Sequence, residues 1–166
     1  MMKMSVKKTI AIVGATEKTG KIIAEKFSSL PYRLLLISND SNELQKLSQD
    51  ISGKRSVAEI DTIGCVKDGC WEADIIILAV GDCDENEAVE KMKEVATQKI
   101  VVEVSDENYP AKDLQKRLPY SKLVKVSGDF DSEEIYISGE DEAVNEEISS
   151  IFNQAGFHSA IIERIK

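Results

Sequence analysis

The residues with the clearest chemical meaning are two glycines near the N-terminus, Gly14 and Gly20. They follow a β-branched apolar run at residues 8–13, which is typical of a strand buried on both faces. Beyond them, Ile23 and Phe27 recur with helical spacing. A helix that begins just after a buried strand directs unpaired backbone N–H groups at the strand's carboxyl edge, and such groups hold a phosphate or pyrophosphate.

The spelling of this turn departs from the usual dinucleotide-binding turn, which has three glycines. These glycines allow the tight turn, the close approach of the pyrophosphate and the packing of the helix on the strand. Gly14 can serve the first purpose and Gly20 the last, whereas Glu17 stands where the variant Gly-Ala-Thr-Gly-x-x-Gly loop has its middle glycine. A carboxylate beside a pyrophosphate costs Coulomb energy, part of which the neighbouring Lys18 would offset. The alternative is a structural turn that binds no ligand, in which Glu17 lies in the first turn of the helix, where acidic side chains are favoured. The candidate phosphate-binding residues are Gly14, Ala15, Thr16, Glu17, Lys18 and Thr19.

A second candidate group, Ser38, Asn39 and Asp40, follows the apolar run at residues 32–37. In a nucleotide-binding unit this strand end meets the adenosine ribose. An acidic residue there accepts from the ribose hydroxyls of NAD, whereas an arginine or lysine pairs with the 2′-phosphate of NADP. No arginine follows at once, so the segment favours NAD over NADP. A helix N-cap explains Asp40 equally well.

Composition limits the class of partner. A chain of 166 residues with 42% hydrophobic content is expected to form one domain spanning residues 1–166. Its net charge of −9 argues against nucleic acid and against an anionic membrane surface. No apolar run approaches the roughly 20 residues that span a bilayer, and the N-terminus does not read as a secretory signal.

The cysteines and the histidine carry no clear site. Cys65, Cys70 and Cys83 form no even-numbered disulfide framework, and with His158 they match no zinc spacing. We therefore expect no metal site, and free thiols in a reducing cytoplasm.

Strands and helices alternate along the chain, which is the pattern of a parallel α/β sheet with right-handed crossovers. The clearest buried strand is predicted at residues 73–81, and its end places Ala79 and Val80 at the edge where the glycine turn lies. Other strands are predicted at residues 56–60, 99–104, 121–126, 134–138 and 158–165. Helices are predicted at residues 43–53, 61–72, 84–96, 110–118 and 140–155, and an acidic loop at 128–134.

Four stretches in this order carry a family resemblance. They are Thr9-Ile-Ala-Ile-Val-Gly-Ala-Thr-Glu-Lys-Thr-Gly, Glu72-Ala-Asp-Ile-Ile-Ile-Leu-Ala-Val, Lys99-Ile-Val-Val-Glu-Val-Ser and Leu118-Pro-Tyr-Ser-Lys-Leu-Val-Lys-Val. The chain resembles the NADP-binding domain of the deazaflavin-dependent (coenzyme F-420-dependent) NADP oxidoreductases and their pyrroline-carboxylate-reductase-like relatives. The resemblance implies a doubly wound, mainly parallel Rossmann sheet of six to eight strands that holds a nicotinamide dinucleotide.

The resemblance also implies places for the cofactor. Ser38 and Asn39 would lie beside the ribose, and Ala79 and Val80 beneath the pyrophosphate and the nicotinamide ribose. The family's serine precedes an arginine that reads the 2′-phosphate, whereas Asn39 stands in that position here. Many relatives carry helical segments that build a dimer and close the substrate cleft, and these have no room after Lys166. A homodimer is still one expectation.

No catalytic residue is predicted. Hydride transfer between two cofactors depends mainly on positioning, and carbonyl reduction needs a proton donor. Tyr109 follows a strand but lacks a Tyr-x-x-x-Lys spacing, and His158 reads as a surface or edge residue. Two hypotheses remain open. The chain is a nicotinamide-dinucleotide oxidoreductase acting on an unidentified small molecule or second cofactor, or a non-catalytic Rossmann module that senses a nucleotide or associates with proteins.

Overall fold

The protein is described by a computed structural model that covers residues 8–53, 57–80, 82–105 and 114–162, with only the backbone of 82–86. Its strands are β1 (Thr9–Val13), β2 (Arg33–Ile37), β3 (Glu59–Ile63), β4 (Ile75–Leu78), β5 (Ile100–Ser105), β6 (Lys122–Asp129), β7 (Glu134–Gly139) and β8 (His158–Ile161). Its helices are α1 (Lys18–Phe27), α2 (Ser41–Gly53), α3 (Val66–Glu72), α4 (Asp82–Met92) and α5 (Glu142–Gln154).

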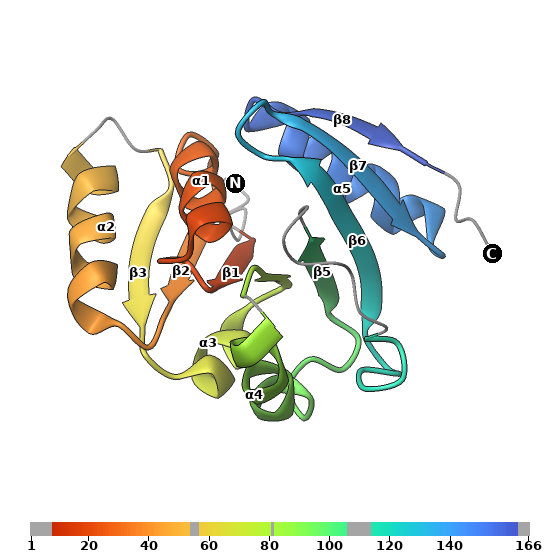
Figure 1. Ribbon diagram of the computed structural model, residues 1–166, viewed down its shortest axis with the longest axis horizontal. Coiled ribbons are helices and arrows are strands. Elements are labelled where there is room, and N and C mark those ends of the chain that lie inside the picture. The colour runs from red at the N-terminus through yellow and green to blue at the C-terminus, as the bar shows by residue number, and fades with distance from the viewer. Residues whose placement is uncertain (1–7, 54–56, 81, 106–113, 163–166) are drawn as a thin grey trace, which may run out of the picture.

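The eight strands form one sheet in the order β3-β2-β1-β4-β5-β6-β7-β8 (Figure 1). Neighbouring strands run parallel except β6 and β7, which pair antiparallel. The first six strands follow the 3-2-1-4-5-6 order of the dinucleotide-binding fold, in which the order reverses between β1 and β4. The predicted doubly wound, mainly parallel Rossmann sheet is therefore confirmed.

Helices cover both faces of the sheet because the central strands bury both of their faces. In β1, Ile10 and Ile12 pack in the cluster that contains apolar residues of α1, α2 and α5, whereas Ala11 and Val13 pack in the cluster of α3 and α4. All five residues of β1 and all four of β4 are buried. This double burial explains why both strands are continuous apolar runs in the sequence.

The third strand lies three residues later than predicted, at Glu59–Ile63 instead of residues 56–60. Among the described strands it lies at the edge of the sheet and pairs with β2 alone, in a register that joins Arg33 to Glu59 and Ile37 to Ile63. An edge strand exposes alternate residues, so its apolar signal is weak and its pairing partner sets its position.

Two predictions near the C-terminal half need correction. The acidic loop predicted at residues 128–134 is shorter, because β6 extends to Asp129, where it pairs with Glu134 at the start of β7, and residues 130–133 form the turn between the two strands. The side chain of Asp129 accepts hydrogen bonds from the N–H groups of Asp131 and Ser132, which closes the turn and lowers the pKa of the Asp129 carboxyl group. Residues 110–113 of the predicted helix lie outside the described residues, and residues 114–118 form a turn.

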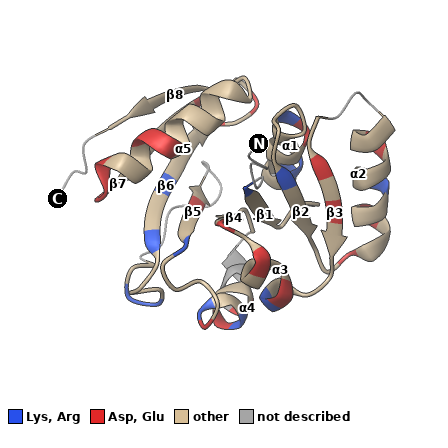
Figure 2. Cartoon of the chain, turned by 180° about the vertical axis from the view of Figure 1, so that it is seen from behind, with Lys and Arg blue, Asp and Glu red and all other residues tan. Residues whose placement is uncertain are grey.

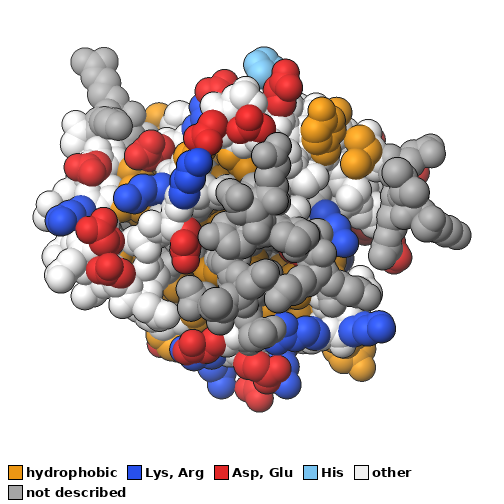
Figure 3. Space-filling model, viewed as in Figure 1, with side chains coloured by type: hydrophobic (Ala, Val, Ile, Leu, Met, Phe, Trp, Pro, Cys, Tyr) orange, Lys and Arg blue, Asp and Glu red, His pale blue; other side chains and the backbone are white. Residues whose placement is uncertain are grey.

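The surface of the protein carries both acidic and basic side chains. Acidic and basic side chains are interspersed on the face shown in Figure 3, and residues of both signs occur on α3 and α4 in Figure 2. Among the described helices, none is long and apolar enough to cross a membrane.

Thiol reactivity tests the packing of α3. Cys65 precedes the helix and is exposed, whereas Cys70 is fully buried, and burial raises the pKa of the Cys70 thiol to about 12. Because the thiolate is the reactive form, iodoacetamide at pH 8 should alkylate Cys65 and spare Cys70. Trypsin cleavage after Lys67 separates Cys65 from Cys70 but leaves Cys70 and Cys83 in one peptide, so tandem mass spectrometry of the digest assigns the label to each cysteine. Protein unfolded in urea is the control, in which both thiols should react; equal labelling of the folded protein would contradict this packing.

Candidate functional site

The turn after β1 is held between the two strands that flank β1. The N–H groups of Gly14 and Ala15 both donate to the Ile37 carbonyl oxygen at the end of β2, at 3.0 and 3.1 Å. On the other side, the Ala79 N–H donates to the Val13 carbonyl oxygen at 2.8 Å. The turn is therefore anchored where the strand order reverses, which is where open α/β sheets bind their ligands.

Gly14 and Gly20 fill the two structural roles predicted for them. Gly14 has a φ of +89°, which L side chains rarely adopt, and a Cβ there would meet the Ala79 carbonyl oxygen and lie 2.7 Å from Cγ1 of Val80. A Cβ on Gly20 would meet the Gly14 carbonyl oxygen. The first glycine lets the chain turn beside β4, and the second lets α1 lie directly against the end of β1.

Helix α1 begins earlier than the sequence suggested, so Gly20 lies within its first turn and not before it. Glu17 occupies the N-cap position with extended φ and ψ angles of −72° and 160°, and its side chain makes no capping hydrogen bond. The Glu17 N–H donates to the Gly14 carbonyl oxygen at 3.0 Å. The half-buried Glu17 side chain lines the cavity described below.

Lys18 does not neutralise Glu17 as expected. Its ammonium group pairs with Asp131 in the β6–β7 turn at 3.2 Å, and both side chains are largely exposed. The acidic turn predicted from the sequence thus attracts the first basic residue of α1. Such an exposed pair contributes little to stability, about 0.2–1 kcal/mol.

Ser38 and Asp40 connect the glycine turn to the start of α2. The hydroxyl groups of Ser38 and Thr16 share a hydrogen bond of 2.6 Å, and Ser38 Oγ also accepts from the Asp40 N–H at 3.1 Å. Asp40 Oδ1 accepts from the N–H of Glu43 at 3.1 Å, so Asp40 is the N-cap of α2. The capping interpretation is confirmed, and this bond uses only one of the two carboxylate oxygens.

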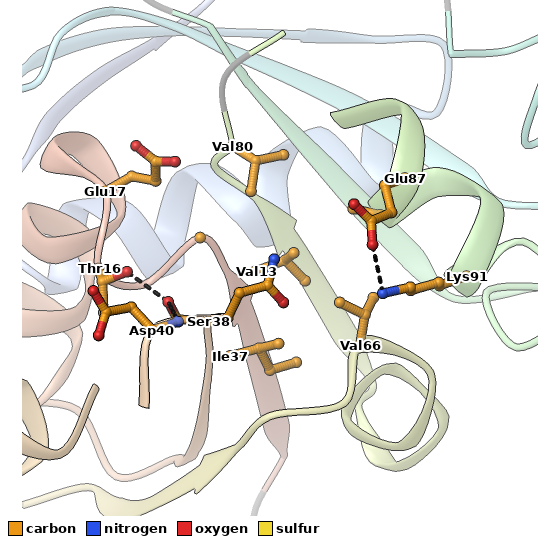
Figure 4. Close-up of a pocket in the computed structure, with 13 residues that line it drawn as sticks. Val13, Thr16, Glu17, Ile37, Ser38, Asp40, Val66, Val80, Glu87 and Lys91 are labelled. Atoms are coloured by element: carbon orange, nitrogen blue, oxygen red, sulfur yellow. Dashed lines mark hydrogen bonds and ion pairs between the residues drawn. The ribbon is translucent and has the colours of Figure 1, made fainter. Parts of the chain in front are cut away.

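These groups border a cavity of about 200 Å³ (Figure 4). Seven of the predicted site residues line it: Gly14, Thr16, Glu17, Ser38, Asn39, Asp40 and Val80. Four others lie beside it without lining it: Ala15, Lys18, Thr19 and Ala79. Of these, Ala15 and Ala79 are buried in the core. The remaining lining residues were not predicted: Val13, Ile37, Val66, Glu87, Ala88 and Lys91.

Of these unpredicted residues, Val66 belongs to α3, and Glu87, Ala88 and Lys91 belong to α4. Helix α4 contributes an ion pair to the cavity wall. Lys91 donates to Glu87 at 2.8 Å, one helical turn away on α4. This hydrogen bond lowers the pKa of Glu87 and raises the pKa of Lys91, so both groups are charged at neutral pH. In the sequence, these two charged residues are typical of an exposed helix surface. Only the order of the strands would have predicted that they line the cavity. Helix α4 follows β4, whose carboxyl end borders the reversal of strand order.

Other residues weighed for chemistry lie elsewhere or outside the described residues. Tyr109 falls in the part of the chain that the structure does not describe. His158 is exposed at the start of β8, as expected for an edge residue. Among the described residues, no group of three or more His, Cys, Asp or Glu side chains is arranged to hold a metal ion.

Comparison with known proteins gives structural matches only. No protein-family model matches this sequence, and no curated protein matches it. A protein of Arthrobacter sp. FB24, assigned as an F-420-dependent NADP reductase, superposes with a TM-score of 0.71 at 14% identity, over 95% of this chain and 84% of that one. Pyrroline carboxylate reductase of Plasmodium falciparum, solved with NADP, gives a TM-score of 0.66 at 14% identity, over 98% and 59% of the two chains.

A third match is a dehydrogenase of 5-formyl-3-hydroxy-2-methylpyridine 4-carboxylic acid, described as an NAD⁺-dependent dismutase. It gives a TM-score of 0.76 at 14% identity, over 96% of this chain and 59% of that one. The chain therefore spans about three-fifths of the length of the last two matches. At these identities the matches establish the fold. The resemblance to F-420-dependent and pyrroline-carboxylate-reductase-like proteins is confirmed at that level, and the chain has the fold of an NAD(P)-binding Rossmann domain.

Replacing Gly20 with alanine tests the close contact at the turn. The added methyl group would lie 2.8 Å from the Gly14 carbonyl carbon, and because the neighbour is backbone it cannot move aside easily. We expect Gly20→Ala to lower the free energy of unfolding by about 2 kcal/mol or more, the typical scale of overpacking. Urea unfolding followed by circular dichroism measures the change.

Gly64→Ala is the matched control, because a Cβ at Gly64 meets nothing within 4 Å. Its effect should stay within about 0.5 kcal/mol, as for most surface substitutions. Equal stability of the two variants would contradict the close approach of α1 to β1.

Proposed function

We propose that this chain binds a nicotinamide dinucleotide and serves as the cofactor-binding domain of an oxidoreductase. The observation that carries the proposal is the contact of Gly20 with the Gly14 carbonyl, which seats the start of α1 on the end of β1. This contact lies beside a cavity, at the reversal of strand order. A helix N-terminus in that position favours a pyrophosphate, because its N–H groups and its dipole both attract negative charge.

In the proposed complex, the backbone of residues 15–19 holds the pyrophosphate. The N–H groups of Ala15 and Glu17 already donate to carbonyl oxygens, so the attraction comes from the rest of this segment and from the helix dipole. Ser38, Asn39 and Asp40 contact the adenosine ribose. Ala79 and Val80 lie beneath the pyrophosphate and the nicotinamide ribose. The cavity of about 200 Å³ is smaller than the roughly 300–1,000 Å³ of pockets that enclose a whole small molecule. The adenosine end therefore occupies the cavity, and the rest of the cofactor crosses the open carboxyl edge of the sheet.

The cofactor, when bound, supplies the hydride chemistry, while this chain binds and orients it. The similar structures support a nicotinamide cofactor, since the three described above are named for NADP or NAD⁺. The second substrate is a small molecule or another cofactor, held together with a partner or a second copy of this chain. A Rossmann module that senses a nucleotide or acts by association is the alternative hypothesis.

The same site favours NAD over NADP. Asn39 stands where a 2′-phosphate-binding arginine would be, and Asp40 retains Oδ2 to accept from a ribose hydroxyl while Oδ1 caps α2. A 2′-phosphate would lie close to the Asp40 carboxylate, and like charges at short range repel. We propose NAD(H) as the preferred cofactor on this ground.

Calorimetric titration with NADH, NADPH, NAD⁺ and NADP⁺ tests the proposal. We expect NADH and NAD⁺ to bind at least tenfold more tightly than their 2′-phosphorylated counterparts, because one charge-assisted hydrogen bond is worth about 1.5–3 kcal/mol. A protein that gives no heat of binding with any of the four would overturn the proposed cofactor role and favour association.

Asp40→Asn is the informative variant for this titration. Asparagine caps a helix about as well as aspartate, so α2 should keep its stability while the site loses one negative charge. The preference for NADH over NADPH should fall by about tenfold. If the preference stayed the same, Asp40 would be a cap without a role in cofactor choice.

Glu17 gives a separate prediction about the pyrophosphate. Its carboxylate lines the cavity at the start of α1, so Glu17→Gly should tighten binding of all four dinucleotides by removing a like charge and allowing closer approach of the backbone. Glu17→Gln removes the charge alone and should give part of the gain. Unchanged or weaker affinity in both variants would argue against a pyrophosphate at this turn.

A further inference from the structure

The wall of the cavity formed by α4 carries charges that the proposed cofactor contacts do not use. Three carboxylate residues line the cavity, Glu17, Asp40 and Glu87, and Lys91 is the only cation among the described lining residues. The cavity is therefore lined by more negative than positive charge. Lys91 is the one group that could offset the charge of an additional phosphate there.

Lys91 lies across the cavity from the ribose-binding candidates. Figure 4 shows Glu87 and Lys91 on one side, Thr16, Ser38 and Asp40 on the other, and Val13 and Ile37 between them. Lys91 and Val66 both line the cavity. A lysine has four flexible side-chain carbons, so its ammonium group can follow a ligand that enters beside it.

Glu87 already holds this ammonium group. The two residues are four positions apart on α4, with the glutamate nearer the N-terminus, which is the favourable order for such a pair. The Glu87 side chain is 60% exposed and the Lys91 side chain 46%, so solvent screens the ion pair. A bound phosphate could therefore draw Lys91 away from Glu87. Glu87 would then remain as an unpaired carboxylate in the same cavity as a phosphate that carries close to two charges.

We propose that Glu87 is a specificity residue that makes this cavity reject a 2′-phosphate, by neutralising Lys91 and by repelling the phosphate itself. The inference rests on the proposed function, because it assumes that the adenosine end of a dinucleotide enters the cavity. It adds a second element to the choice of NAD over NADP, on a helix distant in sequence from Asn39 and Asp40.

The test is calorimetric titration of Glu87→Gln with NADH and NADPH. Glutamine keeps the shape and the helix propensity of the side chain, and Lys91 becomes available to the 2′-phosphate. We expect the affinity for NADPH to rise about tenfold, as for one gained charge-assisted contact, while the affinity for NADH changes less than about threefold.

Glu90→Gln is the matched control. Glu90 lies on the same helix and loses the same charge, but it pairs with Lys93 at 3.2 Å and with Arg117 at 3.7 Å and does not line the cavity. It should leave both affinities unchanged, which separates the local effect of Glu87 from the reduction in net charge. The double variant Glu87→Gln with Lys91→Gln should lose the gain in NADPH affinity.

Each outcome is decisive. If Glu87→Gln behaved like Glu90→Gln, or if the double variant kept the gain, this inference would be wrong while binding of NADH by the wild-type protein still supported the proposed function. If the wild-type protein bound none of the dinucleotides, the proposed function would fail and this inference with it. Circular dichroism of each variant checks that α4 remains folded.

Discussion

The close contact between the start of α1 and the end of β1 is the constraint on which the site depends. Because neither Gly14 nor Gly20 has a Cβ, the turn can pass beside Ala79, which follows β4, and the helix can lie directly against the Gly14 carbonyl. The same arrangement ties the turn to the Ile37 carbonyl of β2. The start of α1 is thus fixed relative to three neighbouring strands, and any anion held there meets backbone groups that need no rearrangement.

Helix α1 also packs against the part of the protein that contains the antiparallel strands β6 and β7, in addition to the pairing of β6 with β5. Phe27 at the end of α1 packs edge-to-face on Phe152 of α5, with ring centroids 5.0 Å apart, and both rings are fully buried. Lys18 and Lys26 form ion pairs with Asp131 and Glu133 in the turn between β6 and β7. Burial of the aromatic rings contributes most of the stabilisation, since the ion pairs are partly or largely exposed. One face of α1 therefore supports the sheet, while its first turn borders the cavity.

The charges around the cavity are unusual for a site proposed to bind a diphosphate. The helix N-terminus attracts an anion, but Glu17, Asp40 and Glu87 surround it, and Lys18 is paired elsewhere. Backbone N–H groups and the helix dipole would have to supply the attraction that basic side chains supply in other anion sites. Such a site tolerates the charge of a pyrophosphate at a fixed position better than it tolerates an additional phosphate near the carboxylates.

The sequence by itself determined the Rossmann sheet, because residues 10–13 of β1 and all of β4 are continuous apolar runs that must be buried on both faces. It also determined the roles of Gly14 and Gly20 and the capping role open to Asp40, since these follow from local backbone geometry. It misplaced β3 and ended β6 too early, at residue 126 instead of Asp129, because the bounds of edge and hairpin strands are set by their pairing partners. Only the tertiary structure brought Glu87 and Lys91 of α4 opposite Ser38, because their cavity arises from the reversal of strand order, which joins segments about 50 residues apart along the chain.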